Sequence, residues 1–265
     1  MRTSPRPLPP RALIGMVHLC PLPGSPSESH HLDEIVRLAV ADAKALADAG
    51  FDALMIENFG DAPFRATEAD PHTVAAMTVV ARCVRRAVEL PLGINVLRND
   101  ARAALAVATA TEAAFVRVNV HTGVYATDQG IIAGQADETL RYRRRLNADV
   151  AILADVHVKH ALPVSNPSIA EAAEEAAYRG KADGLIVSGT ATGKPTRLED
   201  LRAVRQAVPD RPIYVGSGAS AASIRDLLQL ADGAIIGTAI KQDGRTTAPV
   251  DPSRARAVVQ AARSR

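Results

Sequence analysis

Residues 150–159 read Val-Ala-Ile-Leu-Ala-Asp-Val-His-Val-Lys, an apolar run that becomes polar toward its carboxyl end. A segment with helical spacing of its apolar residues follows over 168–179, and another apolar run comes at 184–188. A short, continuous apolar run is typical of a parallel strand whose two faces are both covered, as crossover helices cover them. This stretch therefore predicts one strand–helix unit and the start of the next.

The same alternation extends over the rest of the chain in both directions. Eight apolar runs are predicted as strands, at 13–19, 53–57, 92–97, 115–120, 150–158, 184–188, 213–216 and 234–237. Helices are predicted between and after them, at 33–49, 71–89, 100–111, 137–147, 168–179, 198–207, 221–230 and 252–262. Eight such units within ~250 residues predict an α/β protein with a (β/α)₈ TIM barrel. A doubly wound open sheet shares this alternation and is the alternative fold.

The composition limits the classes of partner. The chain has 265 residues with 31 Lys and Arg against 29 Asp and Glu, so its formal charge is +2 and gives no reason to expect nucleic acid. No apolar run reaches the ~18 residues of a membrane-spanning helix. Two cysteines and the lack of a secretory signal favour a cytoplasmic protein. Aromatic residues make up only 3 % of the chain, which favours a site lined by charged and amide groups.

The chain is predicted to form one folded domain. Four prolines between positions 5 and 10 mark residues 1–11 as a flexible arm, and residues 12–265 are predicted as a single barrel domain because no linker interrupts them. The Ala-rich helices allow a homo-oligomer, for which a dimer is the default expectation.

Two triplets of polar residues mark the candidate site. Arg117, Asn119 and His121 are spaced by two, and so are Asp155, His157 and Lys159. Alternate residues of a strand share a face, so both triplets are predicted to point into the mouth of the barrel, where the active sites of such barrels lie. The valines between them, at positions 118, 120, 156 and 158, are expected to face the helices. His18, Glu57 and Asn95 end other predicted strands and complete the cluster.

Glycine-rich turns follow the last two predicted strands. In many barrels, backbone N–H groups after strands seven and eight bind phosphate, and glycine lets the anion approach closely. We therefore predict a phosphate site on Gly216, Ser217, Gly218, Gly237 and Thr238, with Ser188 and Lys194 reaching it from the sixth loop. The order G-x-G-x-x-A from 216 also fits a dinucleotide fingerprint loosely, but no acidic residue ends the next predicted strand. Tight turns with no ligand are the remaining alternative.

These residues predict acid–base chemistry on a phosphorylated sugar or nucleoside-like molecule, by an isomerase, lyase or hydrolase. Asp155 or Glu57 is the predicted general base and His157 or His18 the general acid, with Lys159 in the same catalytic set. The predicted substrate-binding residues are Asn95, Arg117, Asn119, His121, Ser188 and Lys194. The loop at 122–134 is predicted to act as a lid. We assign no cofactor and no metal ligand; a divalent metal held by His18, Glu57, Asp155 and His157 stays open as an alternative.

Several segments resemble the BtpA/SgcQ family. They are IGMVHLCPLPGSP (14–26), ENFGDAPF (57–64), GINVLRND (93–100), FVRVNVHTG (115–123), LADVHVKH (153–160) and VSGTATGKP (187–195). The resemblance runs from about residue 13 to 252 and implies a barrel of the ribulose-phosphate-binding type. The family is named for a factor needed for photosystem I accumulation. The resemblance therefore also implies an alternative function, that of a non-catalytic factor for photosystem I biogenesis or stabilisation.

Overall fold

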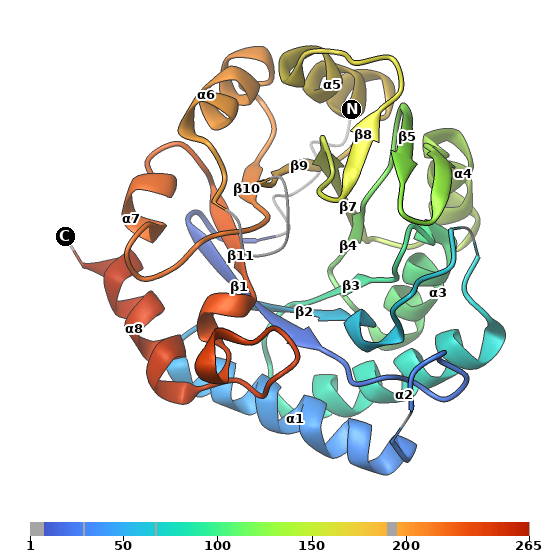
Figure 1. The fold of residues 1–265 in the computed structure, drawn as a ribbon, viewed down its shortest axis with the longest axis vertical. Coiled ribbons are helices and arrows are strands. Elements are labelled where there is room, and N and C mark those ends of the chain that lie inside the picture. Colours follow the sequence, from blue (N-terminus) through green and yellow to red (C-terminus); the bar gives the residue numbers. More distant parts are fainter. Residues whose placement is uncertain (1–7, 29, 67, 190–194, 265) are drawn as a thin grey trace.

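The eight predicted strands form a closed parallel barrel. The structure is a computed structural model that describes residues 8–28, 30–66, 68–189 and 195–264. Strand β1 pairs with both β2 and β11, so the sheet has no open edge, and the barrel is confirmed over the open sheet (Figure 1). In the order around the barrel, the strands are β1 (Ala12–His18), β11 (Gly233–Ile236), β10 (Ile213–Val215), β9 (Gly184–Val187), β7 (Ala151–Val156), β4 (Phe115–Val118), β3 (Leu92–Asn95) and β2 (Ala53–Glu57).

Helices surround the barrel in a ring (Figure 1). They are α1 (Leu32–Ala49), α2 (Pro71–Ala87), α3 (Ala101–Thr111), α4 (Ala136–Arg145), α5 (Ile169–Glu174) with its π-helical continuation η2 (Glu175–Arg179), α6 (Leu198–Ala207), α7 (Ile224–Leu227) and α8 (Pro252–Arg263). Side-chain caps explain several of the starting points. Asp100 accepts a hydrogen bond from the Ala103 N–H, and Ser168 forms a capping box with Glu171. The helix predicted at 221–230 is much shorter than expected, since α7 has only four residues.

Two apolar layers hold the barrel together. The interior is filled by side chains such as Met16, Met55, Phe115 and Tyr214, while a larger cluster lies between the strands and the helices. Gly93 makes room for the Phe115 ring, since a Cβ at this glycine would lie 2.1 Å from Phe115 Cε2. Leu8 also packs into the interior, so the described end of the predicted arm contributes to the core. Residues 1–7 of that arm lie outside the described residues.

A small antiparallel sheet, which the sequence analysis did not predict, lies beside the barrel strands. It consists of β5 (Val124–Thr127), β6 (Gly130–Ala133) and β8 (Ala161–Pro163), in the order β6-β5-β8. The segment predicted as a lid is thus a β-hairpin. Val120 and Val158 pack with Tyr125 and Ile132 of this sheet, so the expectation that they face the helices is wrong. Val118 and Val156 do belong to the cluster between strands and helices.

The segments after β2 and β11 contain three short 3₁₀ turns. These are η1 (Phe59–Asp61), η3 (Thr238–Ile240) and η4 (Gln242–Gly244). Across the described part of the chain, no helix is both long and apolar enough to span a membrane.

Candidate functional site

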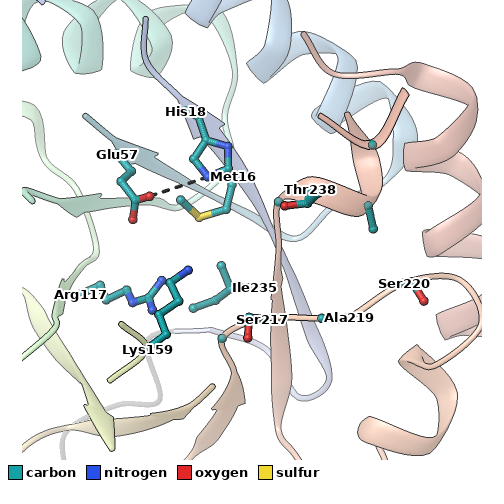
Figure 2. A pocket seen from close by; sticks show the side chains of 15 residues that line it. Met16, His18, Glu57, Arg117, Lys159, Ser217, Ala219, Ser220, Ile235 and Thr238 are labelled. Atoms are coloured by element: carbon teal, nitrogen blue, oxygen red, sulfur yellow. Dashed lines mark ion pairs between the residues drawn. The ribbon is translucent and has the colours of Figure 1, made fainter. Parts of the chain in front are cut away.

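A cavity of about 260 Å³ lies at the carboxyl ends of the barrel strands (Figure 2). Four charged or ionisable side chains line it, namely His18, Glu57, Arg117 and Lys159. The two predicted glycine turns line it as well, through Gly216, Ser217, Gly218, Gly237 and Thr238. The cavity therefore brings together nine of the predicted site residues from β1, β2, β4, the segment after β7, and the turns after β10 and β11.

His18 and Glu57 face each other where β1 and β2 end. The two residues are paired in register, and His18 Nε2 lies 3.7 Å from Glu57 Oε1 (Figure 2). Burial lowers the pKa of His18 well below its usual value, and the nearby ammonium groups of Lys241 and Lys159 lower it further. The imidazole is therefore neutral near pH 7, the form in which its ring nitrogen can accept a proton.

Asp155 is held beneath the cavity by its neighbours. Arg117 Nη2 donates to Asp155 Oδ2 at 3.0 Å, Arg117 Nε donates to Oδ1 at 3.1 Å, and Asn119 Nδ2 donates to Oδ2 at 2.8 Å. Asn119 in turn accepts a hydrogen bond from Asn95. This network occupies both carboxylate oxygens of Asp155, which does not line the cavity, and it fixes the guanidinium of Arg117 at the cavity wall.

Lys159 presents an ammonium group at the centre of the site. Burial and the Arg117 guanidinium lower its pKa to about 8, although Glu57 and Asp155 act in the opposite direction. Among the described residues, no hydrogen bond or ion pair of this ammonium is found. A lysine with this pKa is mostly protonated at pH 7 yet can release its proton, as a general acid requires.

The glycine turns form the other end of the cavity. The Gly216 N–H donates to Val187 O at 2.8 Å, so this group is not a free donor for phosphate, although Gly216 itself lines the cavity. For the N–H groups of Gly218 and Thr238, the described part of the chain provides no acceptor. Ser188 does not line the cavity. Its buried Oγ lies beneath Gly216 and has no hydrogen-bond partner within the described ranges. Lys194 lies outside the described residues.

Two predicted histidines point elsewhere. His121 Nε2 lies 2.8 Å from the carbonyl oxygen of Gly180, which places the ring against the segment after η2. His157 follows the last residue of β7 and has a φ of 51°, so the strand alternation has ended before it. Burial lowers the pKa of His157, and Asp200 on α6 and the Pro167 backbone raise it. The predicted common face of Asp155, His157 and Lys159 is therefore wrong for His157.

The alternative metal site is not assembled. His18 and Glu57 are close together, but Asp155 is bound to Arg117 and His157 lies on another side of the strand end. Within the ranges that the structure describes, no group of three or more His, Cys, Asp or Glu side chains is arranged to hold a metal ion. The four ligands proposed from the sequence thus do not converge.

A second chamber of about 280 Å³ adjoins the first. Glu57 and Lys159 line both, so the two hollows meet at these side chains. Of the predicted site residues, only Asn119 is added here. The other lining residues were not assigned to the site from the sequence: Phe59, Ala62, Phe64, Leu97, Arg98, Asp128 and His160. Two of the four phenylalanines of the chain therefore lie at the mouth, which corrects the expectation of a lining made only of charged and amide groups.

Lys241 is a further residue that the sequence analysis missed. Its side chain is fully buried after η3, and its ammonium lies 2.6 Å from Asp42 Oδ2 on α1. Asp42 Oδ1 also accepts a hydrogen bond from the Val250 N–H. This pair fastens the segment after β11 to α1 and adds positive charge near His18. No local pattern in the sequence indicates it, because the partners are 199 residues apart.

With this geometry established, the comparisons with known proteins show the family. The sequence model of the BtpA family matches residues 10–264. This chain belongs to the BtpA family. The resemblance predicted from the sequence is thereby confirmed.

Relatives are similar along nearly the whole chain. The photosystem I biogenesis protein BtpA of Synechocystis sp. is 48 % identical, over 94 % of this chain and 87 % of that protein. An uncharacterised protein of Methanocaldococcus jannaschii is also 48 % identical, over 95 % of each chain. The sgc region protein SgcQ of Escherichia coli K12 is 33 % identical, over 92 % of this chain and 91 % of that protein.

Solved structures of low sequence identity share the fold. N-(5'-phosphoribosyl)anthranilate isomerase of Pyrococcus furiosus matches with a TM-score of 0.58 at 12 % identity, over 95 % of this chain and 98 % of that chain. Orotidine 5'-monophosphate decarboxylase of Methanocaldococcus jannaschii matches with a TM-score of 0.52 at 14 % identity, over 94 % and 96 %. These matches confirm the TIM-barrel fold.

Proposed function

We propose that this BtpA-family barrel is an enzyme that performs acid–base chemistry on a small phosphorylated molecule, either a sugar phosphate or a nucleoside-like phosphate. The observation that carries the proposal is the lining of one cavity. At one end it has a neutral imidazole, a carboxylate and an ammonium group. At the other end it has backbone N–H groups. Among the described residues, this ammonium has no ion-pair partner and these N–H groups have no acceptor.

The phosphate would bind at the glycine turns. The N–H groups of Gly218 and Thr238 supply donors, and the positive charges of Lys159 and Arg117 on the facing wall favour an anion. The proposal does not depend on a helix dipole, since α7 and η3 are too short to supply one of any size. The names of the two structural neighbours, a 5'-phosphoribosyl isomerase and a 5'-monophosphate decarboxylase, support a phosphorylated ligand.

The proton-transfer roles follow from the environments of three side chains. His18 lines the cavity in its neutral form and is assigned as the general base, with Glu57 beside it orienting the ring or sharing the proton. Lys159, with a pKa of about 8, acts as the general acid. Asp155 positions Arg117, whose guanidinium orients the substrate. This assignment reverses the role expected for His18 from the sequence and calls for no cofactor. The reaction class, whether isomerisation, cleavage or hydrolysis, depends on the substrate.

Calorimetric titration tests the proposal. Ribose 5-phosphate and inorganic phosphate should bind, and ribose should not bind in the same concentration range. Lys159→Met should weaken the binding of ribose 5-phosphate by about tenfold or more, since a charge-assisted contact contributes about 1.5–3 kcal/mol. Lys44→Met, which removes an exposed lysine on α1, is the matched control and should leave binding unchanged. If a broad set of sugar phosphates and nucleotides fails to bind, the proposed function is wrong.

A second candidate function is favoured by the name of one relative. The 48 % identical protein of Synechocystis is a photosystem I biogenesis protein, so we keep the alternative that this chain is a non-catalytic assembly factor. Complementation of a Synechocystis strain that lacks its relative separates the two candidates. A surface-borne assembly role should survive Glu57→Gln combined with Lys159→Met, because both side chains lie in the cavity. An enzymatic role should not survive this change.

A further inference from the structure

The second chamber has a different chemistry from the phosphate end. Phe59, Phe64 and Leu97 form an apolar wall, contributed by η1, the loop that follows it and the segment after β3. The Phe59 ring also contacts the His18 ring, with centroids 4.9 Å apart. A wall of flat aromatic side chains suits a planar apolar group better than it suits a hydrated sugar.

A buried cation lies in the same chamber. Arg98 is only 5 % exposed, and its Nη2 donates to the carbonyl oxygen of Lys159 at 2.7 Å. In the described part of the chain no carboxylate is within ion-pair distance of this guanidinium. Burial lowers the pKa of Arg98, yet the group stays charged at any ordinary pH because its usual pKa is so high. A buried guanidinium without an ion pair calls for an oxygen acceptor, which a ligand would supply.

The second chamber is lined in part by residues from outside the barrel strands and their turns. Asp128 comes from the turn between β5 and β6, and His160 directly precedes β8, so the small antiparallel sheet supplies part of the lining. The phosphate end is built instead from the turns of the barrel itself. The two ends meet at Glu57 and Lys159, which is where the proposed proton transfer takes place.

From these observations we infer that the substrate is a phosphorylated pentose carrying a planar ring of nucleobase size with an oxygen acceptor, and that the ring occupies the second chamber. The inference rests on the proposed function, since it places the phosphate at the glycine turns. The volumes of about 260 and 280 Å³ are both large enough for one such half of the molecule. The bond that reacts then lies between the two halves, beside Glu57 and Lys159.

Uridine 5'-monophosphate and ribose 5-phosphate provide a matched pair of probes, because they share the pentose phosphate and differ by the ring. In calorimetric titrations at pH 7, uridine 5'-monophosphate should bind about tenfold more tightly or better, as burial of a ring predicts. Phe64→Ala and Arg98→Met should each remove most of this gain. Phe64→Ala should leave the Kd of ribose 5-phosphate within about twofold, which also shows that this variant is folded. Arg98→Met is compared by the ratio of the two Kd values, because its guanidinium also holds the backbone of Lys159. Phe64→Leu, which keeps an apolar wall, should retain most of the gain.

The possible results separate the two proposals. If neither compound binds, the proposed function fails and the inference fails with it. If ribose 5-phosphate binds but uridine 5'-monophosphate binds no more tightly, the inference alone is overturned. It is also overturned if the gain persists in Phe64→Ala and Arg98→Met, because the ring would then lie outside the second chamber.

Discussion

The guanidinium of Arg117 and the carboxylate of Asp155 form a buried ion pair across the neighbouring strands β4 and β7, with 3.0 Å between Nη2 and Oδ2. The side chains are 2 % and 0 % exposed. Asn119 donates to the same carboxylate, which is fully buried and does not line the cavity, so Asp155 is not placed to accept a proton from a substrate there. Asp155, one of the two general bases predicted from the sequence, therefore supports Arg117 in this structure.

The main effect of removing the Asp155 side chain should be a loss of stability of the fold. Asp155→Ala leaves the Arg117 charge buried and unpaired, which should lower the free energy of unfolding by about 3–5 kcal/mol in urea titrations. The double variant Arg117→Met with Asp155→Leu should recover most of this loss, because it removes both charges. A stable, inactive Asp155→Ala protein would indicate a catalytic base instead.

Replacing Lys159, unlike replacing Asp155, should stabilise the folded protein at pH 7. Its pKa falls from 10.5 to about 8 on folding, so the buried ammonium costs the folded state on the order of 3 kcal/mol at pH 7. Lys159→Met should therefore raise the free energy of unfolding at pH 7. Between pH 8 and about 10.5, the folded protein binds fewer protons at Lys159 than the unfolded chain does. The free energy of unfolding of the wild type should therefore rise through this range, and the stability difference between Lys159→Met and the wild type should shrink.

Urea titrations of both proteins at pH 7 and pH 9.5 provide the measurement. Lys44→Met is the control and should show no such dependence on pH. The interpretation of Lys159 as a functional, destabilising group is wrong if Lys159→Met is less stable than the wild type at pH 7.

The strand alternation predicted the site only as far as the strands extend. Arg117 lies within β4, and its position toward the mouth follows from the strand period. His121 and His157 lie beyond the last residues of β4 and β7, where the backbone is no longer extended, so the period says nothing about them. Lys159 lies in a loop, and its side chain lines the cavity. The strand period predicted this position correctly, but only by coincidence, because Lys159 does not lie in a strand.

The second chamber could not be predicted from local patterns. Phe59, Phe64 and Arg98 lie in loops whose paths depend on contacts between distant segments, such as the hydrogen bond from Arg98 to Lys159 O. The antiparallel sheet was missed because its strands have only three or four residues, too few for a period to stand out. The eight β/α units were recognisable because each has a buried strand and most have a long amphipathic helix.

His18 should remain neutral below the usual titration range of histidine. Burial is the largest cause of its lowered pKa, and Lys241 is the next. In NMR titrations, the imidazole signal that disappears in His18→Gln should not move near pH 6.5, the usual midpoint. Because the unfolded chain takes up this proton more readily, His18 should also make the fold less stable as the pH falls below about 6.5.

Lys241 provides a way to alter that pKa from outside the cavity. Lys241→Met combined with Asp42→Asn removes both charges of the buried pair and keeps an acceptor for the Val250 N–H. The titration midpoint of His18 should then move upward, because a nearby positive charge is gone. An unchanged midpoint would show that Lys241 has no influence on the site.

Gly216 should tolerate no side chain, although its φ is not in the left-handed region. A Cβ at this position would lie 2.3 Å from Ser188 Oγ and 2.5 Å from Ile186 Cγ2. Gly216→Ala should therefore lower the free energy of unfolding by about 1–3 kcal/mol, as overpacking does, and weaken phosphate binding by shifting the turn.

Ser188→Ala alone should be nearly neutral, since its buried Oγ has no partner among the described residues. In the double variant, part of the loss should be recovered because the closest contact is gone, and urea titrations of the four proteins measure this coupling. Strict additivity would show that the turn avoids Ser188 and that the glycine is required for another reason.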